Sequence, residues 1–245
     1  MNLNYDSAVA ILRDIYWVGY EEKDTNLHCN SYVLIDDEEV VFFDTGSIPD
    51  FPVIMRKVLE VVDFETISVV VASHQDPDVC GNMAIVEDVI DNPELQIAVH
   101  SNTARLIKHY GIKSDIYIVD KHDYKIRLKS GRELEFIYAP YLHSPGAIVT
   151  YDKKTKTLFT GDIFGGVSEE WSLFEDDNLL ENMKTFHQLY MPSNQILKSF
   201  LSKLERYDIE RILPQHGSVI EGKSVNKAIE FLKNVPCGID LIEEG

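Results

Sequence analysis

The sequence predicts an α/β fold in which two β-sheets pack together with helices on the outside. Apolar strand patterns alternate with helical patterns along all 245 residues, which is long enough to bury one full core. Their order is strand-rich, helix-rich, strand-rich, helix-rich, which suggests two related halves. No Pro/Gly-rich linker or low-complexity segment interrupts this order. We therefore expect a single domain over residues 1–245.

The first half of the sequence contains strand patterns that end in polar residues. Its predicted strands are 14–20, 29–36, 39–46, 67–73 and 95–100. Apolar residues three and four positions apart predict helices at 50–62, 82–90 and 101–110. Ser101 is the predicted N-cap of the last of these helices, because a serine hydroxyl can accept a hydrogen bond from the first helical turn.

The second half repeats this arrangement. Its predicted strands are 115–120, 124–128, 133–140, 147–152, 157–162 and 209–217. The segments 147–152 and 157–162 flank KKTK, which predicts a hairpin. Helices are expected near 177–190, 194–206 and 224–235.

Composition excludes several classes of function. The formal net charge of −18 disfavours nucleic acid as a partner, because the phosphate backbone would be repelled. No apolar run reaches the length of a membrane span, and no signal peptide is evident, so we expect a cytoplasmic location. Cys29, Cys80 and Cys237 lie far apart, which argues against a disulfide framework or a zinc ribbon.

Four apolar strand patterns are followed by residues that bind metals in proteins. The segments read VVVASHQDPD, FIYAPYLHSPG, LFTGD and RILPQHG. Because sites in layered α/β folds are assembled at strand ends, we expect these residues to converge. The candidate metal ligands are His74, Asp76, Asp78, His143, Asp162 and His216. Asp162 or His216 alone is more often an ordinary loop residue, but the six together favour a metal site.

The ligand types favour redox chemistry. Pro77 predicts that 74–78 is an extended loop, so that His74, Asp76 and Asp78 point the same way. Six ligands suit two ions better than one, and a carboxylate such as Asp162 can bridge them. Imidazole and carboxylate together make iron or manganese candidates beside zinc. A carboxylate at position 76 also stabilises added positive charge, which favours redox or dioxygen chemistry over hydrolysis.

Other polar residues are given supporting or structural roles. Asp44, in FFDTG, is expected to orient a ligand histidine. Cys80 is expected to be a small buried residue rather than a ligand. The remaining histidines are assigned to the surface or the core, with His28 the one that could lie near the site: His28, His100, His109, His122 and His187.

These motifs resemble the metallo-β-lactamase superfamily, whose fold is an αββα sandwich. Its hydrolases carry H-x-H-x-D-H and bind two zinc ions, whereas this chain carries H-x-D-x-D-V at 74–79. The chain is more similar to the flavodiiron proteins, whose pattern is H-x-E-x-D followed by His, then a distant His, Asp and His. The resemblance covers nearly the whole chain and includes CNSYVLID, FFDTG, SHQDPDVCGN, LHSPGAIVTYD, LFTGDIFGG and LPQHG.

The resemblance implies a centre of two iron ions of the Fe–O–Fe type. The implied ligands are His74, Asp76 and His143 for one iron, Asp78 and His216 for the other, and Asp162 as the bridge. Two positions depart from the family pattern. Asp76 is one methylene shorter than the usual glutamate, so the first iron would be held differently. Val79 stands in place of a histidine and cannot bind metal, which leaves room for an exogenous ligand at the second iron.

Flavodiiron proteins continue into a flavodoxin-like domain that carries FMN. This chain ends at Gly245, so we expect no FMN here. The chain therefore resembles stand-alone oxygen-binding di-iron proteins that are linked to bacterial chemotaxis. This resemblance implies an oxygen sensor that binds dioxygen as a peroxide-like adduct and acts on a signalling protein.

Two alternatives remain open from the sequence. One is an oxidoreductase that reduces dioxygen or nitric oxide with a separate redox partner as electron donor. The other is a metal-dependent hydrolase, against which Asp76 and Val79 both count. Loop 167–177 is predicted to cap the site rather than to act as a switch.

Overall fold

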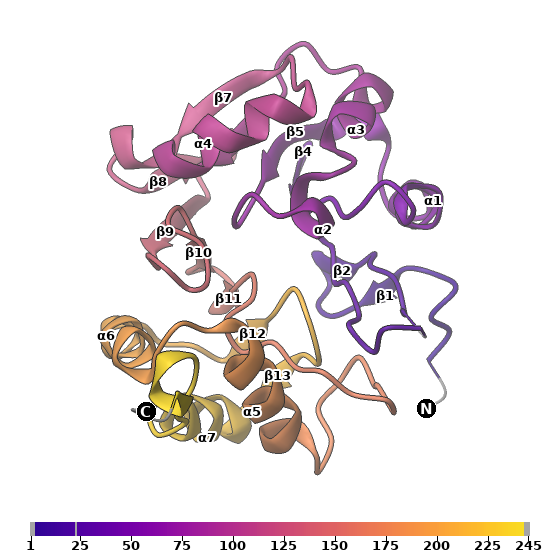
Figure 1. The fold of residues 1–245 in the computed structure, drawn as a ribbon. Helices are drawn as coiled ribbons and strands as arrows, with labels where there is room; N and C mark the ends of the chain where they lie inside the picture. Colours follow the sequence, from indigo (N-terminus) through magenta and orange to yellow (C-terminus); the bar gives the residue numbers. More distant parts are fainter. Residues whose placement is uncertain (1–2, 23, 243–245) are drawn as a thin grey trace. The chain divides into compact units, whose positions relative to one another are not determined.

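The computed structural model describes residues 3–22 and 24–242. They divide into two compact units, each of which combines strands with helices (Figure 1). The first unit is Met1–Glu21 with Cys29–Leu134, and the second is Glu22–His28 with Glu135–Gly245. The mixed α/β class predicted from the sequence is confirmed.

The first unit contains a seven-stranded sheet in sequential order. Its strands are β1 (Val9–Ala10), β2 (Ile15–Trp17), β3 (Tyr32–Asp36), β4 (Glu39–Phe43), β5 (Ile67–Val71), β6 (Gln96–Val99) and β7 (Asp115–Ile118). Strands β1 to β4 pair antiparallel, whereas β4 to β7 pair parallel. The carboxyl ends of β4 and β5 therefore lie at the same edge of the sheet. Residues that follow these two strands are placed beside each other there.

Helices of the first unit bury apolar faces in a core formed with this sheet. They are α1 (Phe51–Leu59), α2 (Pro77–Cys80), α3 (Met83–Ile90) and α4 (Ser101–Ile107), with short 3₁₀ turns at Phe64–Thr66, Lys108–Tyr110 and Val119–Lys121. The predicted cap of α4 was wrong. Helix α4 is capped by His100 rather than Ser101, because the His100 Nδ1 accepts a hydrogen bond from Asn102 N at 3.1 Å. Imidazole nitrogen here takes the place of the expected hydroxyl.

The second sheet has the order β13-β12-β11-β10-β9-β8. Its strands are β8 (Lys125–Arg127), β9 (Glu133–Tyr138), β10 (Ile148–Asp152), β11 (Thr157–Phe159), β12 (Arg211–Leu213) and β13 (Ile220–Glu221). The predicted hairpin is confirmed as the antiparallel pair β10 and β11. Strand β11 also pairs parallel with β12, with Phe159 opposite Leu213. The segments that follow these two strands, 160–162 and 214–216, therefore leave the sheet side by side.

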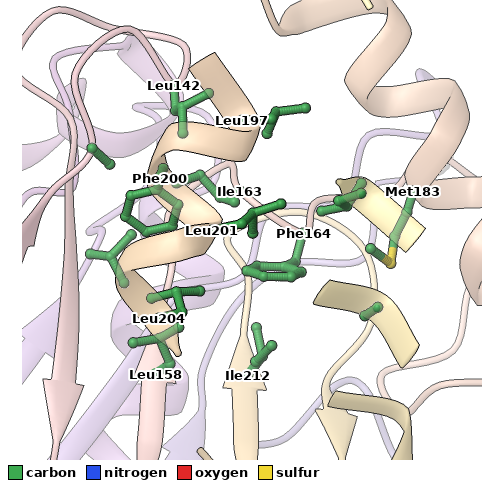
Figure 2. Packing of buried hydrophobic residues seen from close by; sticks show 14 of the residues in the cluster. Leu142, Leu158, Ile163, Phe164, Met183, Leu197, Phe200, Leu201, Leu204 and Ile212 are labelled. Atoms are coloured by element: carbon green, nitrogen blue, oxygen red, sulfur yellow. The ribbon is translucent and has the colours of Figure 1, made fainter. Parts of the chain in front are cut away.

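The second unit also contains α5 (Leu179–Tyr190), α6 (Asn194–Leu204), α7 (Lys223–Leu232) and a 3₁₀ turn at Ile239–Leu241. Figure 2 shows how the buried face of α6 meets the sheet. Leu197, Phe200, Leu201 and Leu204 belong to one buried cluster with Leu158, Ile212 and Phe164. Apolar burial of this kind is the main source of stability for a helix in a folded chain. The same cluster includes Phe164, which lies in the segment that follows β11.

Among residues 3–22 and 24–242, no helix combines the length and the apolar character needed to cross a bilayer.

Candidate metal centre

The six predicted ligands fall into two sets of three. His74, Asp76 and Asp78 belong to the first unit, and His143, Asp162 and His216 belong to the second. Within each unit, the set lies in segments that follow strands, as the sequence predicted.

His74 follows β5 and is held by a short chain of polar contacts. Asp44, just after β4, accepts a hydrogen bond through Oδ1 from Ser73 N at 2.8 Å. The Ser73 hydroxyl lies 3.0 Å from His74 Nδ1. Asp44 therefore contacts Ser73, which in turn contacts the histidine, and the orienting role of Asp44 stays a prediction. Asp44 has a φ of 50°, a left-handed conformation that aspartate tolerates better than most residues.

Asp76 lies beside His74 at a separation suited to a shared ion. Asp76 Oδ2 is 3.8 Å from His74 Nε2, too far for a hydrogen bond. Metal bonds of about 2.0–2.2 Å allow two ligand atoms of one ion to lie about 3–4 Å apart. Gln75 Nε2 donates to Asp76 Oδ1 at 2.9 Å and orients the carboxylate.

The structure corrects the local conformation expected for 74–78. Asp76 is extended, with φ −70° and ψ 156°, but the short helix α2 begins at Pro77. Proline is compatible with the first helical position, because its missing N–H has no acceptor there in any helix. Asp78 therefore lies in the first turn of α2, and the period-two argument applies only to His74 and Asp76.

In the second unit, the carboxylate of Asp162 lies between two histidines. Asp162 Oδ2 is 3.0 Å from His143 Nε2, and Oδ1 is 3.7 Å from His216 Nε2. Asp162 and His216 are buried, and His143 is partly exposed. Each oxygen of this carboxylate thus faces a different imidazole.

His216 is oriented by a backbone carbonyl that the sequence did not reveal. Its Nδ1 donates to His28 O at 2.9 Å, which places the proton on Nδ1 and directs Nε2 toward Asp162. Ligand histidines in proteins are commonly fixed by such a contact. Gln215 N also donates to Gly161 O at 2.8 Å, which ties the His216 segment to the turn before Asp162. The sequence placed His28 near the site but gave no sign of this role.

His187 makes a hydrogen bond to the turn that follows Asp162. It is fully buried in α5, and burial lowers its pKa from 6.5 to about 4. Its Nδ1 donates to Met183 O at 2.6 Å, and its Nε2 accepts from Phe164 N at 3.3 Å. The neutral imidazole thus joins α5 to a residue two positions after Asp162.

The donor atoms in each unit fit iron. Both sets contain only imidazole nitrogens and carboxylate oxygens, which suit iron and manganese as well as zinc. Cys80 is not assigned as a metal ligand, because its thiol donates a hydrogen bond to His74 O at 3.1 Å. Burial, followed by the charges of Asp44 and Asp78, raises the pKa of this thiol. A bound cation would offset the same concentration of negative charge.

Cys29 is a neighbour of the site that the sequence did not predict. Its Sγ lies within 4.8 Å of a carboxylate oxygen of Asp78. No spacing pattern could have revealed this, because the two residues lie far apart in the sequence.

Solved structures with a similar fold include a chemotaxis sensor and a flavodiiron protein. The apo state of the chemotaxis sensor ODP from T. denticola gives a TM-score of 0.82 at 26% identity, covering 96% of each chain. A structure described as the peroxy diiron species of chemotaxis sensor ODP gives 0.79 at 26% identity, covering 96% of this chain and 97% of that one. The flavodiiron protein from Giardia intestinalis gives 0.83 at 22% identity, covering 94% of this chain and 59% of that one.

Curated relatives are longer than this chain. An uncharacterized protein of Methanocaldococcus jannaschii is 29% identical over 91% of this chain and 59% of its own length. The anaerobic nitric oxide reductase flavorubredoxin of Pectobacterium atrosepticum is 26% identical over 84% of this chain and 42% of its own length. The chain therefore spans less than two thirds of these relatives.

A family model described as ODP family beta lactamase matches residues 27–217. That range contains all six predicted ligands and both residues that orient the histidines, His28 and Asp44. Since the match extends over most of the sequence, the chain belongs to the ODP family of beta lactamases.

Proposed function

We propose that this chain binds dioxygen at a two-iron centre and acts as an oxygen sensor in bacterial signalling. The observation that carries the proposal is the buried Asp162 carboxylate, which directs one oxygen to His143 and the other to His216. This is the carboxylate that the flavodiiron resemblance assigns as the bridge. The 26% identity to a chemotaxis sensor described with a peroxy diiron species supports the choice of dioxygen.

The ligand assignment is part of this proposal. It gives His74, Asp76 and His143 to one iron, Asp78 and His216 to the other, and Asp162 to both. The separations of His74 from Asp76, and of Asp162 from its two histidines, support it. Val79 takes the place of a possible additional ligand and is fully buried in α2.

The protein's own residues would hold His216 in a metal-binding tautomer and would place a hydroxyl against His74. His28 O keeps the proton of His216 on Nδ1, and Asp44 positions Ser73 against His74 Nδ1. Burial of Asp162 limits the access of water to its carboxylate. When bound, two ferrous ions would supply the electrons that dioxygen requires in order to bind reversibly.

A second candidate function is reduction of dioxygen or nitric oxide with electrons from a separate protein. The relative described as an anaerobic nitric oxide reductase flavorubredoxin favours this alternative. Hydrolysis has less support, because Asp76 and Val79 replace two histidines of the hydrolytic pattern. A cytoplasmic location and a signalling protein as partner also belong to the main proposal.

The deciding experiment mixes reduced protein with dioxygen. The protein is prepared without oxygen, its metal is quantified, and visible spectra are recorded after mixing. We expect about two irons per chain and a long-lived charge-transfer band. Repeated oxygen consumption in the presence of excess reductant would instead establish a reductase. Zinc with no spectral change would refute both redox functions.

A further inference from the structure

A segment of the second unit is fastened along the residues that follow His216. We call residues 168–175 the Trp171 strap. Its backbone pairs with Val219, whose N–H donates to Leu173 O at 2.7 Å and whose carbonyl accepts from Glu175 N at 3.1 Å. Ser218 Oγ also donates to Ser172 O at 2.6 Å. The strap is thus joined directly to residues two and three positions after His216.

Trp171 makes two further contacts from the strap. Its indole Nε1–H donates to Gly217 O at 2.9 Å. Its ring stacks on the imidazole of His28, with centroids 4.7 Å apart and planes 23° apart. Trp171 therefore contacts both the residue after His216 and the residue whose carbonyl orients His216.

These contacts close a ring of interactions around His216. His216 Nδ1 donates to His28 O, and the His28 ring stacks on Trp171. Trp171 in turn donates to the carbonyl of Gly217, which follows His216 directly in the chain. A second contact fixes His28, whose Nε2 lies 3.4 Å from Ser168 O in the same strap. His28 and Gly217, which respectively accept from and directly follow His216, are therefore both held by the strap.

The strap and its neighbours leave little enclosed space between them. The space below it, lined by residues such as Phe164, Met183 and Leu179, measures about 10 Å³, which is the room of roughly one water molecule. Gly217 has a φ of +80°, and an added Cβ would lie 2.6 Å from Gly166 N. The Gly217 backbone therefore packs closely against Gly166 on one side, while its carbonyl accepts from Trp171 on the other.

We propose that Trp171 is a positioning residue for His216, and that the Trp171 strap responds to occupancy of the metal site through it. The response of the strap rests on the proposed function, because it requires a metal at His216. The positioning role of Trp171 concerns the metal-free protein. The sequence predicted this loop as a simple cap, whereas its side-chain contacts give it a specific mechanical connection to one ligand.

Two variants separate the contacts of Trp171. Trp171→Phe keeps a ring for stacking and loses the N–H donor, and Trp171→Leu loses both. Tyr151→Phe is the matched control, because it removes a hydrogen bond of the same kind, from Tyr151 Oη to Asp208 O at 2.8 Å, in the same unit. Amide hydrogen exchange at 217–219 and the ring ¹⁵N shifts of His216 are measured in metal-free protein.

We expect exchange at 217–219 to be about tenfold faster in Trp171→Phe than in the wild type, since one hydrogen bond to Gly217 is lost. In Trp171→Leu, the His216 ring shifts should also change, because His28 loses its stacking partner. Tyr151→Phe should alter neither measurement. Unchanged exchange and ring shifts in both Trp171 variants would overturn the proposal. Equal acceleration in helix α6 would also overturn it, because it would indicate a merely structural role.

Metal loading tests the response of the strap. Iron release to a chelator should be about 10–100-fold faster in Trp171→Leu, and unchanged in Tyr151→Phe. With Trp17→Phe to leave Trp171 as the sole tryptophan, addition of Zn²⁺ should shift its emission. Wild-type protein that binds no metal would refute the proposed function, while the exchange data would still decide the positioning role. Bound iron with wild-type release rates in Trp171→Leu would refute this inference alone.

Discussion

Replacing His187 by glutamine should remove a source of acid sensitivity from the second unit. The pKa of His187 is lowered from 6.5 to about 4 by burial. Between these pH values the unfolded chain binds a proton that the folded chain does not, so stability falls as pH decreases. A difference of about 2.5 pKa units corresponds to about 3 kcal/mol of unfolding free energy, lost between pH 6.5 and pH 4.

The assay compares wild type and variant across this pH range. His187→Gln retains a donor and an acceptor for Met183 O and Phe164 N but cannot titrate. Urea unfolding at each pH, with a chelator present to exclude metal effects, gives the wild-type-minus-variant difference in free energy. We expect this difference to decrease by about 3 kcal/mol from pH 7 to pH 4. His109→Gln is the matched control, because His109 is exposed.

A constant difference across that range would refute the reasoning. It would mean that His187 is protonated at no cost in the folded protein, or that its environment is more hydrated than the structure shows. Parallel curves for His187→Gln and His109→Gln would refute it equally, since burial is the stated cause of the lowered pKa.

Three further predictions concern metal binding and the first unit. Asp162→Asn should lose at least one of the two proposed irons, measured as iron per chain, because the bridge loses its charge; full retention would contradict the bridging role. Asp44→Ala should weaken metal binding about 10–100-fold, while Asp44→Asn, which retains an acceptor for Ser73 N, should have a smaller effect in a competition assay. Burial lowers the pKa of Lys57 from 10.5 to about 8. The unfolding free energy of the wild type relative to Lys57→Met should therefore rise by up to about 3 kcal/mol between pH 8 and pH 10.5, measured by chemical unfolding. A free-energy difference that does not change with pH would contradict the lowered pKa.

Much of the fold was predictable because its signals are local. The strands that precede Ser73 and Thr160 are short segments rich in apolar and β-branched residues, and period and composition identify such segments without tertiary information. The candidate ligands were proposed for the same reason, since each lies within a few residues of the end of such a strand. Paired β11 and β12 then bring Asp162 and His216 together through strand register, as the strand-end argument requires.

The contacts missed from the sequence depend on distant backbone atoms. His28 O is 188 positions from His216 and has no side-chain signature. Lys57 is fully buried, with its ammonium donating to Tyr5 O and Gly19 O at 2.6 and 2.7 Å. A lysine on an otherwise apolar helix face predicts exposure unless those carbonyls are known. The start of α2 was missed because proline both excludes an interior helix and permits a first turn.

The assignment of residues 22–28 to the second unit affects how this architecture can be divided. A fragment that begins at Glu135 would contain His216 and Trp171 but not His28, so it would lack the acceptor of His216 Nδ1 and the stacking partner of the indole. Truncation before Glu135 therefore cannot yield an intact copy of that unit. Any gene fusion, fragment complementation or circular permutation that separates the units would have to keep the segment 22–28 with the second unit. The two units have separate cores, but one cut of the chain cannot separate them.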